Sequence, residues 1–259
     1  MNAEELQVYQ DLIGILCWAV DIARINILLE VYLLASQLAL PRVGHLKTVY
    51  RVFGYLKQVP KLKMYFDPSK PMISKDIFQK FYWEDLYPNA CEPTPLDMPR
   101  PRGKSVSTHC FVDANHVGDK TTRISITGII KFCNRSRIIW HSKRTNGVET
   151  STFGSEVTAM KNFVDLIAAL RYKLRMFVIP IERSTDIFCD NEAVYKNAYT
   201  PESKLRKKRH STSYHMSREA VASGTCSMTK EDTETNFSDI FTKVIPRPRR
   251  ELLLDSFSY

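Results

Sequence analysis

Cys110-Phe111-Val112-Asp113 is the stretch of sequence that decides the fold, because three apolar residues run directly into an acidic one. The apolar residues predict a short strand that ends at Asp113. The pattern returns at Asp186-Ile187-Phe188-Cys189, which predicts a second strand, ending at Asp190. A carboxylate is a poor choice for a core position, so these two aspartates are candidates for chemistry.

The surrounding sequence predicts a mixed α/β domain over residues 105–259. Apolar residues from Val157 to Leu174 recur at helical spacing and predict a long helix that stops before Pro180. Shorter helices are expected through Ala193–Ala198, near Ser213–Ala222 and from about Ser238. Three further strands are expected at Ile124–Phe132, Arg137–His141 and Cys226–Thr229. This order predicts a mixed sheet with helices packed on it.

The first 104 residues differ in character from the rest of the chain. Residues 1–66 carry apolar residues at helical spacing and predict a small helical unit. Residues 67–104 contain seven prolines and neither a helical nor a strand period, so we expect a linker or an irregular connection.

Composition and charge exclude several classes of protein. The chain has 259 residues, 44% of them hydrophobic, which excludes wholesale disorder. Its net charge is +9, and residues 105–259 hold 24 Lys and Arg against 17 Asp and Glu, so we expect a polyanionic partner for this half. Six scattered cysteines argue against a zinc site, and the acidic start at Glu4 and Glu5 against a signal peptide. We therefore expect an intracellular protein, in cytoplasm or nucleus.

Four carboxylates stand out by their positions: Asp113 and Asp190 at strand ends, and Glu156 and Asp239 in first turns of helices. A cluster of carboxylates needs divalent cations at neutral pH, and two Mg²⁺ or Mn²⁺ ions about 4 Å apart would suit phosphodiester hydrolysis. Each residue also has a structural interpretation, since strand-end aspartates begin turns and first-turn acids suit the helix dipole. Glu149 is a weaker alternative to Glu156.

A run of basic residues is a candidate surface for nucleic acid. Its alternative interpretation is a solvated loop or a localisation signal. Arg247, Arg249 and Arg250 are candidates to extend the surface, and His210 or His215 is a candidate proton shuttle at the edge of the site. The basic residues of the run are Lys204, Arg206, Lys207, Lys208 and Arg209.

Ordered motifs in this half resemble the ribonuclease H domain of copia-type retrotransposon polyproteins. The resemblance implies a ribonuclease H-like fold, a five-stranded mixed sheet flanked by helices. It also implies metal-dependent cleavage of the RNA strand of RNA–DNA hybrids, with Asp113, Glu156, Asp190 and Asp239 as the acidic set. The motifs are Phe111–Asn115, Ser125–Gly128, Ile139–Arg144, Ser151–Glu156, Cys189–Asn191 and Ser238–Lys243.

The N-terminal segment resembles the tail of the reverse transcriptase of the same polyproteins. The stretches that carry this likeness are Tyr9–Gly14, Leu38–Arg42 and Gly44–Lys57. No two aspartates are adjacent in the chain, so the paired-aspartate motif of the polymerase is missing and we expect no DNA synthesis. We expect a fragment of a polyprotein that partners RNA–DNA hybrid and other parts of the same element, such as its reverse transcriptase or integrase.

Two functional hypotheses follow. The first is a metal-dependent endonuclease that hydrolyses the RNA strand of RNA–DNA hybrids. The second is a catalytically inactive remnant that at most binds nucleic acid electrostatically. Departures from the family pattern favour the second, because Arg209 stands where a lysine is usual and His210 is displaced by one position. A metabolite enzyme is disfavoured, since no glycine-rich phosphate loop is present.

Overall fold

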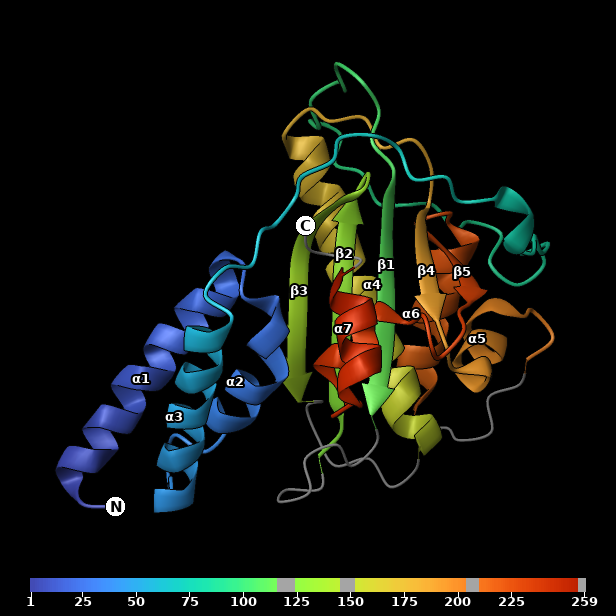
Figure 1. Ribbon diagram of the computed structural model, residues 1–259. Helices are drawn as coiled ribbons and strands as arrows, with labels where there is room; N and C mark the ends of the chain where they lie inside the picture. The colour runs from blue at the N-terminus through green and yellow to red at the C-terminus, as the bar shows by residue number, and fades with distance from the viewer. Residues whose placement is uncertain (116–123, 145–151, 204–209, 256–259) are drawn as a thin grey trace.

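A five-stranded mixed sheet forms the centre of the molecule (Figure 1). The computed structural model describes residues 1–115, 124–144, 152–203 and 210–255. The sheet order is β3-β2-β1-β4-β5. The strands are β1 (Thr108–Asn115), β2 (Ile126–Cys133), β3 (Ser136–Arg144), β4 (Thr185–Cys189) and β5 (Cys226–Lys230).

The directions of the strands bring the predicted site residues to one edge of the sheet. β2 is antiparallel to both β1 and β3, whereas β4 is parallel to β1 and β5 is parallel to β4. Strands β1, β3, β4 and β5 therefore all end at the same edge. This topology confirms the predicted fold class, a ribonuclease H-like mixed five-stranded sheet flanked by helices.

One face of the sheet is covered by α4 (Thr152–Met176), α5 (Glu192–Tyr199) and α6 (Ser211–Ala222). Met160, Phe163 and Ile167 of α4 pack in one hydrophobic cluster with strand residues such as Val112 and Ile187. Since α4 follows β3 and α5 follows β4, both helices begin at the edge where those strands end. The predicted helices on this face are therefore confirmed.

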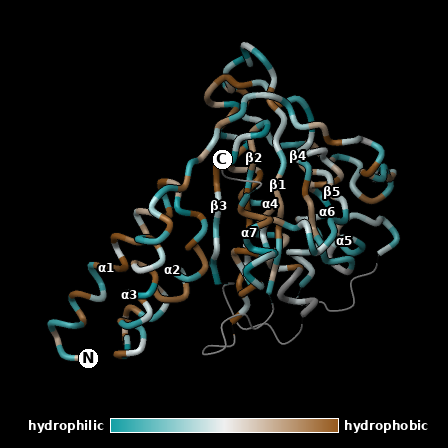
Figure 2. Tube along the Cα trace, in the orientation of Figure 1, coloured by the Kyte–Doolittle hydropathy of each residue, from teal (hydrophilic) through white to brown (hydrophobic). Residues whose placement is uncertain are grey.

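The other face is covered by segments from both ends of the chain. A 3-10 turn, η4 (Phe237–Phe241), and helix α7 (Arg247–Asp255) lie on it. The N-terminal helices α1 (Ala3–Ile22), α2 (Leu28–Ala35) and α3 (Val43–Gln58) pack beside them, with a short 3-10 turn, Ile25–Ile27, between α1 and α2. In Figure 2, hydrophobic and hydrophilic stretches alternate along α1, as expected of a helix with one buried side.

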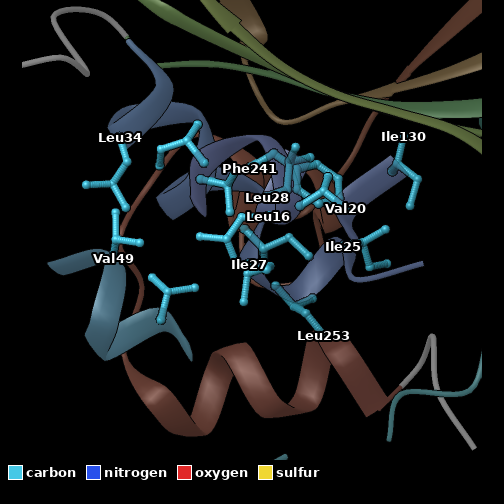
Figure 3. Packing of buried hydrophobic residues seen from close by; sticks show 14 of the residues in the cluster. Leu16, Val20, Ile25, Ile27, Leu28, Leu34, Val49, Ile130, Phe241 and Leu253 are labelled. Atoms are coloured by element: carbon cyan, nitrogen blue, oxygen red, sulfur yellow. The ribbon is translucent and has the colours of Figure 1, made fainter. Parts of the chain in front are cut away.

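The N-terminal helices share one hydrophobic core with the sheet. Leu16 and Leu28 of this unit belong to one hydrophobic cluster with Ile130 of β2, Phe241 of η4 and Leu253 of α7 (Figure 3). In addition, the Trp140 indole of β3 donates a hydrogen bond to the Val20 carbonyl at 3.1 Å. The helical unit is therefore packed against the sheet, not held only by its connection.

Residues 67–104 have little regular structure besides the short turn η2 (Lys75–Ile77), but they are anchored along their length. The Glu92 carboxylate accepts hydrogen bonds from Arg171 at 2.7 and 2.8 Å and also pairs with Arg175. The two arginines counter the effect of burial and hold the pKa of Glu92 at about 2. Five residues before Glu92, the Tyr87 hydroxyl lies 2.8 Å from Nδ1 of His215 and so anchors the segment to α6.

Several sequence expectations about element bounds are wrong. Strand β3, expected to end at His141, continues to Arg144. Strand β1 does not end at Asp113 but continues to Asn115, because Ala114 and Asn115 still pair with Thr127 and Ile126 of β2. The helix expected from Ser238 is instead the 3-10 turn η4, and α7 starts only at Arg247. Pro246 separates the two, since proline suits the start of a helix and not its interior.

Within the described residues, no helix has both the length and the apolar character needed to cross a bilayer.

Gly128 of β2 sits opposite Asp113 in the strand register and lets η4 approach the sheet. A Cβ atom at this position would lie 2.7 Å from Cγ2 of Thr242 and 2.9 Å from the Ser238 carbonyl oxygen. The close packing of η4 on β2 therefore requires a residue without a side chain.

We predict that Gly128→Ala destabilises the protein by about 1–3 kcal/mol, because the added methyl group would push η4 off the sheet. Urea unfolding measures this free energy. The matched control is Gly14→Ala in α1, where a Cβ atom meets nothing within 4 Å. That change should stabilise the protein by about 0.5–1 kcal/mol. Equal effects of the two substitutions would contradict the packing argument.

Candidate metal centre

Three aspartates from separate segments meet at the edge of the sheet. Asp113 lies on β1, Asp190 directly follows β4, and Asp239 lies in η4. One carboxylate oxygen of each lies within 4.8 Å of the other two. Their side chains are 5%, 10% and 0% exposed, in the same order. Three of the four predicted site residues are thus brought together.

Side-chain hydrogen bonds fasten η4 to the sheet and so fix Asp239 beside Asp113. The Asn236 amide donates to the Val112 carbonyl at 3.1 Å, while its oxygen accepts from Ser238 N at 3.1 Å and caps the turn. Asn115 donates to the Thr242 carbonyl at 3.0 Å. Ser142 of β3 donates to the Phe241 carbonyl at 2.7 Å. The turn is therefore tied to β1 on two sides and to β3 through Ser142.

Two cationic side chains compensate the charge of the aspartates. Nζ of Lys243 lies 2.9 Å from Asp239, 3.2 Å from Asp113 and 3.8 Å from Asp190. Arg249 of α7 donates to the other oxygen of Asp239 at 2.6 Å and also to the Thr233 carbonyl. Both oxygens of Asp239 are therefore held by cations, one by a lysine and the other by an arginine with several partners.

Burial close to other carboxylates raises the pKa values of Asp113 and Asp190. Burial, together with the nearby Asp239 and Asp190, raises the pKa of Asp113 to about 6, against the opposing effects of Lys243 and Thr242. Burial and Asp239 likewise raise the pKa of Asp190. Burial lowers the pKa of Lys243, but the three carboxylates outweigh it and the net direction is upward. The three carboxylates therefore favour the charged form of the Lys243 ammonium.

The donor set fits a divalent cation. Carboxylate oxygens are the ligands that Mg²⁺ and Mn²⁺ prefer, and these three converge on one point. The ammonium of Lys243 already stands among them, which shows that the point attracts a cation. The structure therefore supports a cation site formed by Asp113, Asp190 and Asp239.

Glu156, the fourth predicted residue, lies in α4 just past the first turn, not within it as predicted, because the helix begins at Thr152. Its side chain is outside the described residues. Ala159 and Met160, one turn further on, line a small cavity of about 20 Å³ together with Asp113 and Asp190. Positions three and four apart share one side of a helix. The backbone of Glu156 is thus one turn away from residues that border the aspartates.

The other predicted residues have different outcomes. Lys204, Arg206, Lys207, Lys208, Arg209 and Glu149 lie outside the described residues. His210 is buried at the start of α6. His215 lies 2.8 Å from the Tyr87 hydroxyl through Nδ1. A role of either histidine as a proton shuttle stays a prediction.

Sequence reasoning missed the cations and the amide that complete the site. Lys243 lies four residues after Asp239 within a helical turn, a spacing that predicts an ion pair and could have pointed to it. Arg249 was predicted to bind phosphate, but its side chain is 17% exposed and it pairs with Asp239 and Glu234. The hydrogen bond from the Asn236 amide to the Val112 carbonyl was not predicted.

Comparison with curated proteins relates the sequence to retrotransposon polyproteins. The chain is 28% identical over 146 residues to the retrovirus-related Pol polyprotein from transposon RE1 of Arabidopsis thaliana, and 27% identical over 146 residues to that from transposon RE2. A third relative, from transposon TNT 1-94 of Nicotiana tabacum, is 27% identical over 143 residues. These matches cover 55–56% of this chain but only 10–11% of each relative.

The chain is therefore similar in sequence to a short part of the Pol polyproteins of copia-type retrotransposons, and the predicted resemblance is confirmed. No protein-family model matches the sequence.

Two solved structures resemble the chain. One is an N-terminal RNase H domain from Mycobacterium tuberculosis, with a TM-score of 0.39 and 9% identity, over 59% of this chain and 99% of that one. The other is a foamy viral protease–reverse transcriptase in complex with an RNA/DNA hybrid, with a TM-score of 0.32 and 14% identity, over 75% of this chain and 24% of that one. Both scores are below 0.5, so the fold assignment depends on the sheet topology itself.

We predict that Lys243→Met tightens the binding of Mn²⁺ about tenfold or more. The reason is that removal of a unit charge about 4 Å from a cation changes their interaction by about 1–4 kcal/mol at the edge of a protein. Electron paramagnetic resonance of free Mn²⁺ measures the affinity. Without divalent cations, the same variant should unfold at a lower temperature, because the aspartates lose their counterion.

The matched control is Lys230→Met. Lys230 ends β5 at the same edge of the sheet, but it pairs at 3.3 Å with Glu192 and not with the aspartates. Its loss should leave Mn²⁺ affinity unchanged. Equal or weaker Mn²⁺ binding by Lys243→Met would show that the lysine does not occupy the position of the cation.

Proposed function

We propose that this chain is a metal-dependent endonuclease that hydrolyses the RNA strand of RNA–DNA hybrids, as part of a retrotransposon polyprotein. The observation that carries the proposal is the meeting of three aspartates with little exposure at one edge of the sheet, one from β1, one directly after β4 and one from η4. The sequence similarity to retrovirus-related Pol polyproteins supports it.

The position of each residue at the site suggests its role in binding the cations. Asp113, near the end of β1, and Asp190, directly after the parallel strand β4, would hold the cations from the sheet, and Asp239 would hold them from η4. The Thr242 hydroxyl donates to Asp113 and orients it. Arg249 fixes one oxygen of Asp239, which leaves the other, now bound by Lys243, to face the cation. We assign the fourth ligand to Glu156.

Two Mg²⁺ or Mn²⁺ ions, when bound, would activate water and stabilise the leaving oxygen of the phosphodiester. The chain's own part is to place carboxylates around the scissile phosphate and to hold the backbone of the hybrid. We assign the holding of the backbone to the basic run Lys204–Arg209. Selectivity for RNA would come from contacts with its 2′-hydroxyl groups.

An inactive remnant that only binds nucleic acid is the second candidate. The observation that favours it is the position of Lys243, whose ammonium contacts all three aspartates and would have to leave before a cation binds. This candidate predicts hybrid binding that weakens steeply with salt, no dependence on divalent cations and no product.

Incubation of a labelled RNA–DNA hybrid with the full chain and Mg²⁺ separates the two candidates. We predict RNA fragments from the unaltered chain and only background from Asp190→Asn, because the amide removes a charged ligand from the site. The control is Asp232→Asn, an exposed aspartate in the turn after β5, which should leave cleavage unchanged. Absence of product, or product unaffected by Asp190→Asn, would contradict the proposed activity.

A further inference from the structure

A long part of the N-terminal unit contains basic residues and no acidic ones. Between Glu30 and Asp67 the sequence has six Lys and Arg residues and not one Asp or Glu. This local charge is hidden in the total for residues 1–104, which carry 13 Lys and Arg against 11 Asp and Glu. The six residues are Arg42, Lys47, Arg51, Lys57, Lys61 and Lys63.

Helix α3 gathers three of these cations on its exposed side. Leu46, Val49 and Val52 are buried in the shared core. Lys47, Arg51 and Lys57 are exposed, as is Tyr50 between them, which is 53% exposed. At 3.6 residues per turn, positions 47, 51 and 57 fall within one half of the helix surface, opposite the buried half.

These cations are not neutralised within the part of the chain that the structure describes. Arg250 pairs with Glu30 at 2.9 Å and Arg247 with Glu251 at 2.7 Å. By contrast, no described carboxylate lies within salt-bridge distance of Lys47, Arg51 or Lys57. A row of exposed, uncompensated cations on a rigid helix attracts a polyanion.

The exposed side of α3 borders a groove whose other wall is α7, the helix that also carries Arg249. The groove has a volume of about 760 Å³ and runs between α3 and α7. Lys61 and Lys63, which follow α3, line one wall. The α7 wall carries Arg247 and Arg250 together with the acidic Glu251 and Asp255, so the excess of positive charge lies on the α3 side. Two residues after Arg247, Arg249 contacts Asp239. One helix, about 10–12 Å wide, therefore separates the groove from the aspartates.

We infer that the basic side of α3 and this groove form a second nucleic-acid surface, which binds the sugar–phosphate backbone of a duplex away from the point of cleavage. The surface consists of Lys47, Arg51, Lys57, Lys61 and Lys63. Its ligand is the same RNA–DNA hybrid that reaches the aspartates, and in this respect the inference rests on the proposed function. The N-terminal helices thereby hold substrate while the sheet edge supplies the carboxylates.

Binding is best measured by fluorescence anisotropy over a range of salt concentrations. The ligand is a labelled RNA–DNA hybrid of about 20 base pairs, which is two helical turns. All proteins carry Asp190→Asn so that the hybrid stays intact. The test variant is Lys47→Gln/Arg51→Gln/Lys57→Gln. We expect the slope of log K against log salt to fall by about 2–3, with affinity about tenfold or more weaker near 0.1 M salt.

The matched control removes three exposed cations from the opposite edge of the sheet, with Arg100→Gln/Arg102→Gln/Lys104→Gln. These residues precede the start of β1, whereas Asp113 lies near its end. The control should keep the slope of the parent protein. An unchanged slope in the α3 variant, or equal losses in both variants, would overturn the inference.

The inference and the proposed activity fail in different ways. If the unaltered chain binds hybrid through α3 but yields no RNA fragments, the activity is contradicted and the binding surface stands. If it cleaves hybrid and the α3 variant binds as well as its parent, the surface is contradicted and the activity stands. Circular dichroism of each variant confirms that the helices are intact.

Discussion

The mutual repulsion of three buried aspartates is the constraint on which the rest of the site depends. Asp113, Asp190 and Asp239 lie too close together and too deep to stay ionised without positive charge beside them. Lys243 and Arg249 supply that charge, and they differ in kind. Arg249 has other partners and little exposure, whereas Lys243 has a flexible stem at the edge of the site. The lysine is therefore the cation that can exchange.

The site belongs to the whole molecule because its parts come from distant segments. Asp239 is placed by η4, which fits against the sheet only because Gly128 has no side chain. Helix α7 contacts both the site and the N-terminal unit. Its Arg249 pairs with Asp239, and its Arg250 pairs with Glu30 of α2. Leu253 of α7 lies in the core that these helices share with the sheet (Figure 3). The N-terminal unit thus supports one of the three ligands.

Much of the fold and the carboxylates, but not their surroundings, could be predicted from the sequence. Asp113 and Asp190 could be predicted because each follows a short run of apolar residues. Asp239 could be predicted because the motif Ser238–Lys243 resembles one in the ribonuclease H domain of copia-type polyproteins. The continuation of β1 to Asn115 depends on pairing with β2, which local hydrophobicity does not encode. The contact of Arg249 with Asp239 depends on where α7 lies, which local sequence does not show. The basic side of α3 did not stand out because acidic residues elsewhere in residues 1–104 nearly cancel the charge of that segment.

The central claim is that the three aspartates form a site for divalent cations. Anomalous diffraction at the manganese edge, from crystals of the full chain grown with Mn²⁺, tests it most directly. The account predicts an anomalous peak within about 2.0–2.2 Å of carboxylate oxygens of Asp113, Asp190 and Asp239, with the ammonium of Lys243 moved away from them. No peak among the aspartates at saturating Mn²⁺, with Lys243 still in contact with all three, would contradict it.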